Sequence, residues 1–493
     1  MRRLWLLALA GGLIAALGHA PFHLWYVALS GFVAISWAVM HAGRPAQGAR
    51  VAWWAGAGYF AVALHWIVEP FLVDAATHGW MAPGALVLLA GGLALFWAAA
   101  GWLAVRLGGT AFRTGVGFAV ALGAAELLRG HVLTGFPWAM PAYIWADTPL
   151  LAATAYTGSY GLTVLTLLGA TGLALWRIGL VPPVLAACGF ALLLGAGGLR
   201  LSQGEAPTQL GTVGLVHPNI PQPEKWARNK VPEHIDRMLA LTREVVADGA
   251  VDLVLWPEVS VVYPLDVAGP VLTAASEAAG GVPVMLGINR RDGDDWFNAL
   301  VEVGASGQVG AVYDKVHLVP FGEYIPFRLG FLRAMAATGS NGFSSGESVR
   351  LLDTPLGKAL PLICYEGIFP GHVFKAGARA DYILLVTNDA WFGTFAGPYQ
   401  HLDQARFRAA EQGLPVVRAA NVGVSALIDR FGAVSDPLDL DETGVRSGVV
   451  RTGPPTVYAR TGDLPLIGFL LLSATVLWLT RPRNTIANDR ASV

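Results

Sequence analysis

The chain has 493 residues, of which 54% are hydrophobic and only 14% are charged; soluble domains carry about 25% charged residues, so the composition indicates a protein that lies at least partly in a membrane. The formal net charge of −1 excludes the basic surface of a nucleic-acid-binding protein, and we expect no nucleic acid partner. There are two cysteines, Cys188 and Cys364; because Cys188 lies inside an apolar segment, a disulfide framework is excluded, and no Cys/His cluster has the spacing of a metal site.

Apolar segments follow one another through residues 1–200, which we interpret as a membrane domain. The first segment, after Met1-Arg2-Arg3, has the form of a signal peptide, but others follow at once, so we interpret it as a retained span. Several segments are near or slightly below the ~20 residues that a spanning helix needs. We expect seven transmembrane helices here and a final one at 464–480, with apolar segments at 4–17, 24–40, 51–68, 82–105, 114–128, 158–176, 181–198 and 464–479.

Positive charges between the segments predict the orientation of these helices. Cytoplasmic loops carry an excess of Lys and Arg, and nearly all loop arginines here fall on one side of the predicted membrane. Both termini, including the tail at 481–493, are then cytoplasmic, and the region before the last helix lies outside the cytoplasm. The omission of one helix would reverse this orientation. The arginines on the cytoplasmic side are Arg2, Arg3, Arg44, Arg50, Arg106, Arg113, Arg177, Arg481 and Arg483, and those on the other side are Arg129 and Arg200.

Polar residues stand at the outer end of the fifth predicted helix. Glu126, Arg129 and His131 lead into Thr134-Gly135-Phe136-Pro137-Trp138. One interpretation is anchoring at the membrane interface by Trp138 and Trp145, together with a snorkelling arginine. The other is a loop that supports a site at the outer membrane surface. For each residue taken singly, the anchoring interpretation is slightly favoured.

Residues 203–460 have the charges, turns and short apolar runs of a globular domain. Runs with a strand pattern alternate with helical ones, which predicts an α/β domain of roughly 250 residues, large enough for one core. Strands are expected at 209–217, 251–256, 283–288, 299–303, 359–363, 382–387, 414–419 and 424–429, and helices at 232–248, 368–380 and 400–413.

Three polar residues stand where apolar strands end: Glu258, Lys315 and Cys364. Strand ends are where α/β proteins build their sites. Because Cys364 lies between a strand and a predicted helix, the helix dipole would favour its nucleophilic thiolate. A thiol nucleophile needs a base, which Glu258 supplies if burial raises its pKa. It also needs a cation or an N–H group at the oxyanion, for which Lys315 and the Tyr365 N–H are candidates.

Each of these residues also has a purely structural interpretation. Cys364 would then be a buried thiol, Glu258 a helix N-cap and Lys315 a charge on an edge strand. His317 is close to Lys315 in sequence and is expected on the same face of the chain, so a supporting role for His317 stays open.

The motifs around these residues resemble those of a known superfamily. Trp256-Pro257-Glu258, Asp314-Lys315 and Cys364-Tyr365-Glu366, in this order, resemble the Glu-Lys-Cys triad of the nitrilase superfamily. Together with the flanking spans, they make the whole chain resemble the bacterial apolipoprotein N-acyltransferase family. Further matching motifs are Pro320-Phe321-Gly322-Glu323-Tyr324, Asn219-Ile220-Pro221-Gln222, Lys225-Trp226, Thr387-Asn388-Asp389-Ala390-Trp391-Phe392-Gly393 and Asn421-Val422-Gly423-Val424-Ser425, and the one departure is His217-Pro218-Asn219, where a Gln-Gly-Asn-like turn is expected.

The resemblance implies a fold and an activity. The fold is a membrane domain of eight helices plus an extracytoplasmic, nitrilase-like αββα sandwich, placed in the bacterial inner membrane. The activity is ping-pong transfer of an acyl chain from a phospholipid, expected to be phosphatidylethanolamine, through a thioester on Cys364. The acceptor is the α-amine of the N-terminal diacylglyceryl-cysteine of an apolipoprotein. No cofactor is implied, and a monomer suffices.

Two alternatives remain beside this reading of the resemblance. One is a membrane-anchored amidase of the same superfamily that acts on a small C–N substrate, against which the eight predicted spans argue. The other is a membrane scaffold with a degenerate nitrilase domain, against which the intact Glu258, Lys315 and Cys364 argue.

Further site residues follow from the resemblance. Glu323 would orient Lys315, and Glu366 would orient the turn that bears Cys364, unless both are surface carboxylates. The apolar, glycine-punctuated stretch 324–343 predicts a mobile lid or a membrane-dipping arm, with ordinary packing as the alternative. The residues expected to contact substrate are Trp226, Asn388, Trp391, Phe327 and Trp138.

Overall fold

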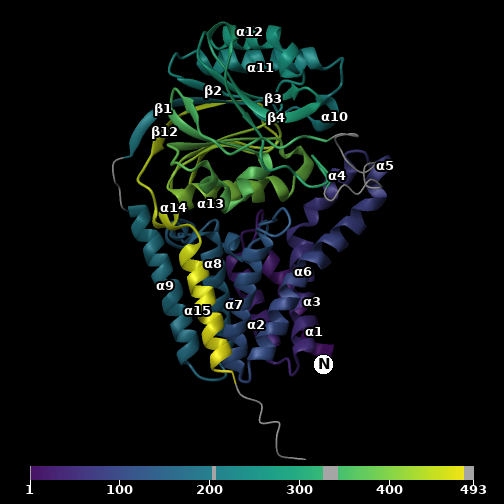
Figure 1. Ribbon diagram of the computed structural model, residues 1–493, viewed down its shortest axis with the longest axis vertical. Helices are drawn as coiled ribbons and strands as arrows, with labels where there is room; N and C mark the ends of the chain where they lie inside the picture. The colour runs from purple at the N-terminus through teal and green to yellow at the C-terminus, as the bar shows by residue number, and fades with distance from the viewer. Residues whose placement is uncertain (1, 203–206, 326–341, 482–493) are drawn as a thin grey trace, which may run out of the picture.

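The computed structural model describes residues 2–202, 207–325 and 342–481, and it has two stacked parts (Figure 1). One part is a bundle of long helices, and the other is an α/β domain that sits on one end of the bundle. The bundle helices are α1 (Arg2–Ala16), α2 (Trp25–Met40), α3 (Pro45–Ala63), α6 (Ala82–Leu107), α7 (Ala111–Arg129), α8 (Leu150–Ala174), α9 (Val181–Ser202) and α15 (Leu464–Leu479).

Several bundle helices have the length and composition of membrane spans. Among the described residues, four helical segments qualify on their own, namely Ala75–Leu107, Ala111–Arg129, Leu150–Ala174 and Val181–Ser202. A fifth results if α3 and the helix that follows it, which bend by 65°, form one broken span. The helices α1, α2 and α15 are apolar but shorter. The chain is thus a membrane protein, and the total of eight spans stays a prediction.

Two expected boundaries in the bundle are wrong. The helix expected at 158–176 begins at Leu150, and Gly158 (φ +64°) interrupts its helical geometry where the expected start lay. The span expected at 51–68 ends at Ala63, because the chain bends there into short helices that lead to α6. These are η1 (His65–Val68), α4 (Glu69–Leu72), α5 (Ala75–His78) and η2 (Gly79–Met81).

The α/β domain is a sandwich of two six-stranded sheets. The strand orders are β12-β1-β2-β3-β4-β5 and β11-β10-β9-β8-β7-β6. The strands are β1 (Thr208–His217), β2 (Leu253–Leu255), β3 (Val284–Asp292), β4 (Asp295–Val303), β5 (Val309–Asp314), β6 (Leu352–Thr354), β7 (Gly357–Ile363), β8 (Tyr382–Thr387), β9 (Val416–Ala420), β10 (Ser425–Ile428), β11 (Val434–Leu438) and β12 (Gly444–Thr452).

Helices cover the outer face of each sheet, which completes an α-β-β-α layering. The helices α11 (Val231–Val246) and α12 (Gly269–Ala278) cover the first sheet, and α13 (Gly397–Gln412) covers the second. Successive side chains of a strand point to opposite faces of its sheet. In β2, Leu253 and Leu255 therefore enter the core between the sheets, whereas Val254 enters the core under α11 and α12. The expected nitrilase-like α/β architecture with two sheets is therefore present.

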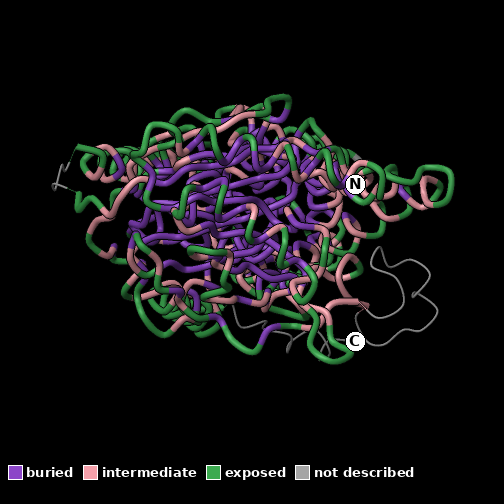
Figure 2. Tube along the Cα trace, turned by 90° about the horizontal axis from the view of Figure 1, so that it is seen from above, coloured by how far each residue is buried: buried purple, intermediate pink, exposed green. Residues whose placement is uncertain are grey.

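The helix α13 lies between the second sheet and the bundle, so both of its faces are buried (Figure 1). Ala405 and Ala409 pack against the sheet, whereas Phe407 and Ala410 belong to the core of the bundle. Seen from above, buried backbone fills the centre of the molecule and exposed loops form its rim (Figure 2). The α/β domain is therefore seated directly on the helices, through contacts made by α13.

Candidate active site

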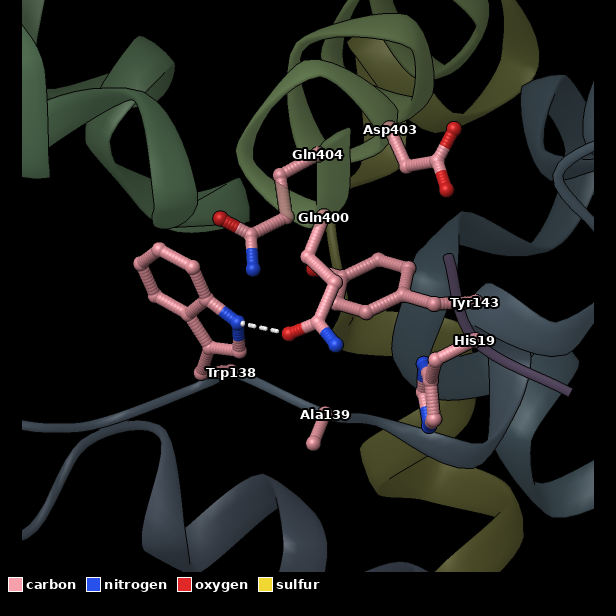
Figure 3. Close-up of a pocket in the computed structure, with 7 residues that line it drawn as sticks. All are labelled: His19, Trp138, Ala139, Tyr143, Gln400, Asp403 and Gln404. Atoms are coloured by element: carbon pink, nitrogen blue, oxygen red, sulfur yellow. Dashed lines mark hydrogen bonds between the residues drawn. The ribbon is translucent and has the colours of Figure 1, made fainter. Parts of the chain in front are cut away.

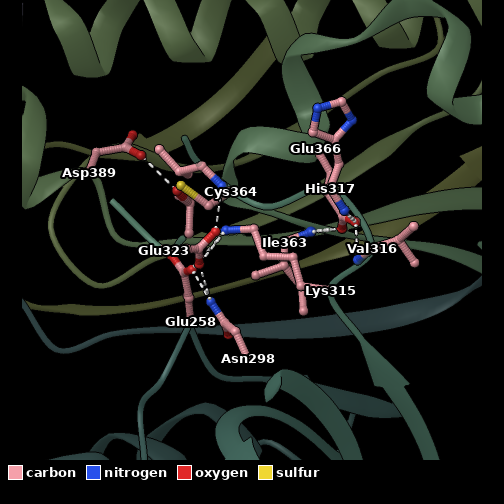
Figure 4. A network of polar contacts seen from close by, with 12 residues as sticks. Glu258, Asn298, Lys315, Val316, His317, Glu323, Ile363, Cys364, Glu366 and Asp389 are labelled. Atoms are coloured by element: carbon pink, nitrogen blue, oxygen red, sulfur yellow. Dashed lines mark hydrogen bonds and ion pairs between the residues drawn. The ribbon is translucent and has the colours of Figure 1, made fainter. Parts of the chain in front are cut away.

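Three strand ends bring Glu258, Lys315 and Cys364 together (Figure 4). Glu258 follows β2 and Lys315 follows β5, both in the first sheet, and Cys364 follows β7 in the second. Their exposed fractions are 7%, 1% and 7%, respectively. The three side chains are thus buried together between the two sheets, and each sheet contributes to the group.

Glu258 is a buried carboxylate with two polar neighbours on one oxygen. Asn298 Nδ2 donates a hydrogen bond to Glu258 Oε1 over 2.7 Å, and Lys315 Nζ lies 3.7 Å from the same oxygen. Burial raises the pKa of Glu258, and the positive charge of Lys315 only partly offsets this effect. A carboxylate with a raised pKa accepts a proton more readily, which suits a general base.

Lys315 is held between two carboxylates. Its Nζ donates to Glu323 Oε1 over 2.9 Å, and the other oxygen of Glu323 accepts from the Val319 N–H over 2.8 Å. Burial alone would lower the pKa of Lys315, but the charges of Glu323 and Glu258 outweigh it and raise the pKa. The side chain is therefore a fixed ammonium group, and Glu323 lies where it orients that group.

Cys364 stands in a strained turn. Its φ of +51° lies in the left-handed region, which is unusual for a residue other than glycine and is typical of functional turns. The α-helix expected at 368–380 is wrong: two short 3₁₀ helices, η8 (Cys364–Ile368) and η9 (Pro370–Ala376), follow instead. Pro370 begins η9, so the proline separates the two short helices, and Gly377 (φ +68°) ends the second one before residue 380.

The thiol of Cys364 does not favour the thiolate at rest. Burial raises its pKa, the nearby Glu258 carboxylate raises it further, and Lys315 opposes them only in part. The expectation that a helix dipole would favour the thiolate is therefore wrong, because only short 3₁₀ helices follow the turn and the thiol is buried. A base must therefore take the proton from the thiol, and Glu258 is a carboxylate close enough to act on Cys364.

Glu366 ties the turn that bears Cys364 to the loop after β5. Its Oε1 accepts hydrogen bonds from the Tyr313 hydroxyl and from the N–H groups of Val316 and His317, over 2.9, 2.8 and 3.0 Å. Its Oε2 accepts from the Ile363 N–H over 2.8 Å. Glu366 thus fixes the spacing between Lys315 and Cys364. His317 belongs to this support, and burial lowers the pKa of His317 to about 4, so its ring is neutral.

A second buried network lies behind Cys364. Asp389 accepts hydrogen bonds from Thr387 over 2.7 Å and from Arg418 over 2.6 Å, and it lies 2.8 Å from His401 Nδ1. His401 Nε2 donates to the Cys364 carbonyl oxygen over 3.3 Å. Sequence reasoning missed His401 and Arg418, because their partners come from distant strands. The only available signal was the polar motif around Asp389 after an apolar strand.

Lys225 was also missed as a member of the site. It ends the short helix α10 (Gln222–Lys225), its side chain is buried, and its Nζ donates to the Glu258 carbonyl oxygen over 3.1 Å. Burial lowers its pKa to about 8, although the charges of Glu258 and Cys364 oppose this shift. A second cation therefore lies beside the base. In the part of the chain that the structure describes, no three His, Cys, Asp or Glu side chains are grouped to hold a metal ion.

Three of the residues expected to contact substrate lie on two turns next to Lys225 and Asp389. Trp226 is 51% exposed and follows α10. Trp391 is half-buried in η10 (Asp389–Phe392). Asn388 is buried, and its Nδ2 donates to Gln222 Oε1 over 2.8 Å, which links the Trp391 turn to the α10 turn.

The other two such residues are placed differently. Trp138 is fully buried under the site: its ring packs against Trp66 and Phe392, and its Nε1 donates to Gln400 Oε1 over 2.8 Å (Figure 3). The structure therefore places Trp138 at the junction with the bundle, below the reacting groups. Phe327 and most of the stretch 324–343 lie outside the described residues.

The arrangement as a whole suits acyl chemistry. A thiol, a carboxylate of raised pKa and a fixed ammonium group lie buried close to one another. The thiol can attack a carbonyl carbon, the carboxylate can carry the proton, and the ammonium group can stabilise the oxyanion. Such a set forms a thioester that a second nucleophile then resolves.

Comparisons with known proteins agree with this chemistry. Residues 212–451 match the family model of carbon-nitrogen hydrolases, and residues 11–172 match that of the apolipoprotein N-acyltransferase N-terminal domain. The apolipoprotein N-acyltransferase of Rhodopseudomonas palustris is 35% identical over 97% of this chain and 95% of its own length. That of Caulobacter vibrioides is 36% identical over 95% of this chain and 93% of its own length. Among solved structures, Saccharomyces cerevisiae Nit3, a nitrilase-superfamily member, is 17% identical with a TM-score of 0.39, covering 53% of this chain and 98% of that chain.

Proposed function

The chain belongs to the apolipoprotein N-acyltransferase family, and we propose that Cys364 is its acyl carrier, Glu258 its base and Lys315 its oxyanion donor. The protein is a membrane-bound acyltransferase that takes an acyl chain from a lipid and transfers it to an apolipoprotein. The observation that carries the residue assignment is the meeting of a buried thiol, a base of raised pKa and a fixed cation at three strand ends.

In the first half-reaction, Glu258 takes the proton of the Cys364 thiol as the sulfur attacks an acyl ester carbonyl of a phospholipid. We propose phosphatidylethanolamine as this donor. A carbon–sulfur bond forms, and the ester carbon–oxygen bond then breaks. The proton on Glu258 passes to the departing oxygen, so a lysophospholipid leaves and the acyl chain stays on Cys364 as a thioester.

The negative charge that develops on the carbonyl oxygen needs a fixed positive partner. Lys315 supplies it, because Glu323 and Glu258 keep its amine protonated and in place. The backbone N–H of Tyr365, at the start of η8, is the second proposed donor. Such preorganised donors stabilise the transition state strongly where water is excluded.

In the second half-reaction, the α-amine of the diacylglyceryl-cysteine attacks the thioester. Glu258 takes a proton from the attacking nitrogen, the carbon–sulfur bond breaks, and the Cys364 thiol is regenerated with that proton. An amide is more stable than a thioester, so this step runs forward. The same base thus serves both halves of the ping-pong cycle, which are linked by the thioester on Cys364.

The proposed placement in the membrane is supported by the loop arginines and by the apolar helices of the bundle. We propose eight spans, both termini in the cytoplasm, and the α/β domain on the periplasmic side of the inner membrane. The proposed domains are a membrane domain at 1–200, a catalytic domain at 203–460, a final span at 464–480 and a tail at 481–493. The proposed active unit is a monomer. We also propose that Trp226, Asn388 and Trp391 line the path of the substrate into the site.

The direct test is transfer of a labelled acyl chain from phosphatidylethanolamine to a diacylated lipopeptide by the purified protein in detergent. Cys364→Ala is expected to abolish transfer, because no thioester can form. The matched control is Cys188→Ala, since Cys188 is the exposed free cysteine of α9 and is expected to be dispensable. Retained transfer in Cys364→Ala, or ammonia release from small amides without lipid, would reject the proposal.

A further inference from the structure

The loop at residues 130–140, which joins α7 to η3 (Pro141–Trp145), lies at the junction of the bundle with the α/β domain and carries the backbone acceptors for several buried donors. We call it the support loop. Within it, four carbonyl oxygens accept hydrogen bonds from buried side chains of both parts of the molecule. The pairs are Gly135 with Tyr365 (3.0 Å), Phe136 with Arg129, Trp138 with Arg129 (2.9 Å) and Ala139 with Tyr59 (3.1 Å).

Arg129 is the centre of this support on the bundle side. Its guanidinium donates to two carbonyls of the support loop, and it forms an ion pair with Glu126, one turn earlier on α7. Trp97 of α6 donates to the other oxygen of Glu126 over 2.8 Å, so the pair is braced by a neighbouring helix. Arg129 is 2% exposed, which excludes the snorkelling interpretation. Hydrogen bonds from a charged group are stronger than those from a neutral one, so the loop is held firmly.

Tyr365 is the contact on the catalytic side. It directly follows Cys364, and its hydroxyl reaches down to the Gly135 carbonyl, so one side chain connects the nucleophile turn to the bundle. The approach is close: Gly135 has φ +75°, and a Cβ there would lie 2.3 Å from the Gly130 oxygen and 3.1 Å from the Phe369 ring. Only glycine fits at this contact.

The same loop reaches the back of the nucleophile by a second route. Trp138 Nε1 donates to Gln400 of α13 (Figure 3), and the next residue, His401, donates to the Cys364 carbonyl oxygen. The Trp138 ring also lies 5.7 Å from the His401 ring, centroid to centroid. Two groups next to the thiol, the Cys364 carbonyl oxygen and the Tyr365 side chain, are therefore connected to the same loop.

We propose that Arg129 is a positioning residue for the nucleophile: it fixes the support loop, the loop fixes the Tyr365 hydroxyl, and Tyr365 sets the geometry of the Cys364 turn. This inference rests on the proposed role of Cys364 as acyl carrier. It gives the bundle a part in catalysis besides anchoring, because an ion pair inside it sets the angle of attack in the domain above. An error of about 1 Å at a reacting atom is enough to slow chemistry by roughly 100-fold.

The test measures how fast acyl-Cys364 forms from phosphatidylethanolamine, by rapid quenching and intact-mass spectrometry over a range of lipid concentrations. Arg129→Lys keeps the charge but loses the planar guanidinium, whose Nη1 holds the two carbonyls while its Nη2 holds Glu126. Tyr365→Phe removes only the hydroxyl. Each is expected to lower the rate at saturating lipid by about tenfold, with the half-saturating lipid concentration unchanged. The double variant is expected to be no slower than the slower single variant, because both changes cut one chain of contacts.

The matched control is Trp145→Phe, which removes a buried hydrogen bond of the bundle, to Thr166 over 2.8 Å, outside the support loop. Any reduction in the acylation rate by Trp145→Phe is expected to multiply with the reduction by Tyr365→Phe, because the two changes affect independent contacts. Glu126→Gln is the second bundle variant if Arg129→Lys fails to fold, and it is expected to behave in the same way. Three results would overturn the inference. The bundle variant that folds could acylate at the wild-type rate, or its reduction in rate could multiply with that of Tyr365→Phe. The change could also be confined to the half-saturating lipid concentration. Acylation that persists in Cys364→Ala would instead reject the proposed function.

Discussion

Lys315 and the two glutamates beside it form a buried set of charges whose members depend on one another. Lys315 Nζ lies 2.9 Å from Glu323 and 3.7 Å from Glu258, and the exposed fractions of the three side chains are 12% or less. A buried charge without a partner is costly, so the set persists only as a whole. At the scale of single residues, the reactivity of Cys364 is therefore a property of its charged neighbours.

The proposed role of Glu258 predicts how activity depends on pH. The base must be ionised, so the rate of acyl-Cys364 formation falls as the pH is lowered through the pKa of Glu258, which burial raises above 4.5. The charge of Lys225 works in the opposite direction and lowers this pKa. Because the pKa of Lys225 is about 8, it is charged throughout the acid limb. Lys225→Met is therefore expected to move the acid limb to higher pH, measured as initial rate against pH.

Two controls separate charge from shape at this position. Lys225→Arg keeps the charge and is expected to leave the acid limb in place, even if the rate falls. Glu224→Gln changes a half-exposed neighbour on the same short helix and is expected to have no effect on the limb. An acid limb that stays at the wild-type pH in Lys225→Met would contradict the assignment of Glu258 as the titrating base.

The nucleophile turn, η8, is the element on which the site depends most. Four donors from β5, from the loop after it and from β7 converge on Glu366. Glu366→Gln replaces one acceptor oxygen by an amide group that faces N–H donors. Leaving a buried donor unpaired costs about 1–3 kcal/mol, so the melting temperature and the acylation rate are both expected to fall. Thermal unfolding in detergent, followed by intrinsic fluorescence, measures the first effect.

The control for Glu366→Gln is Glu233→Gln on α11, a carboxylate that is exposed and paired with Lys230. Substitutions of this kind usually change stability by less than about 0.5 kcal/mol. An equal loss of stability in both variants would mean that the network around Glu366 contributes nothing beyond an ordinary surface charge.

Much of the element order could be predicted from the sequence. Apolar runs that end in a polar residue located the ends of β2 and β7, and hence Glu258 and Cys364. Lys315 was located by the short run before it, although β5 (Val309–Asp314) was not among the expected strands. This works because buried strands need continuous apolar side chains, and reactive groups must stand where the strand ends. The two glutamates Glu323 and Glu366 followed from the resemblance, and the structure places both within hydrogen-bonding distance of the groups that they were expected to orient.

Other features could not be predicted, for identifiable physical reasons. The helix expected after Cys364 fails at Pro370, where composition alone favoured a continuous element. The contacts of His401 and Arg418 with Asp389 join β8, α13 and β9, and no local pattern encodes such distant partners. Arg129 had the signature of a membrane-interface arginine, and only its position beneath the nucleophile turn distinguishes a support from an anchor.

At the scale of the whole molecule, the two parts share one core. Tyr365, Ile368, Phe369 and Phe407 of the α/β domain pack within the core of the bundle. A chain of residues 207–463, without the bundle, would expose these side chains and lose the acceptor of the Tyr365 hydroxyl. It is expected to aggregate and to form no acyl-Cys364, measured by size-exclusion chromatography and mass spectrometry. A monodisperse fragment that acylates at the full rate would contradict a catalytic contribution from the bundle.

The central claim is that Cys364 carries the acyl chain between donor and acceptor. The most direct measurement is the intact mass of the full-length protein after incubation with a single phosphatidylethanolamine species, followed by peptide mapping. We expect one acyl group on Cys364 in the wild type and none in Cys364→Ala. Addition of a diacylated lipopeptide is expected to remove the acyl group from the wild-type protein. Transfer to the lipopeptide without an acyl-enzyme, or an acyl group on any other residue, would contradict the account.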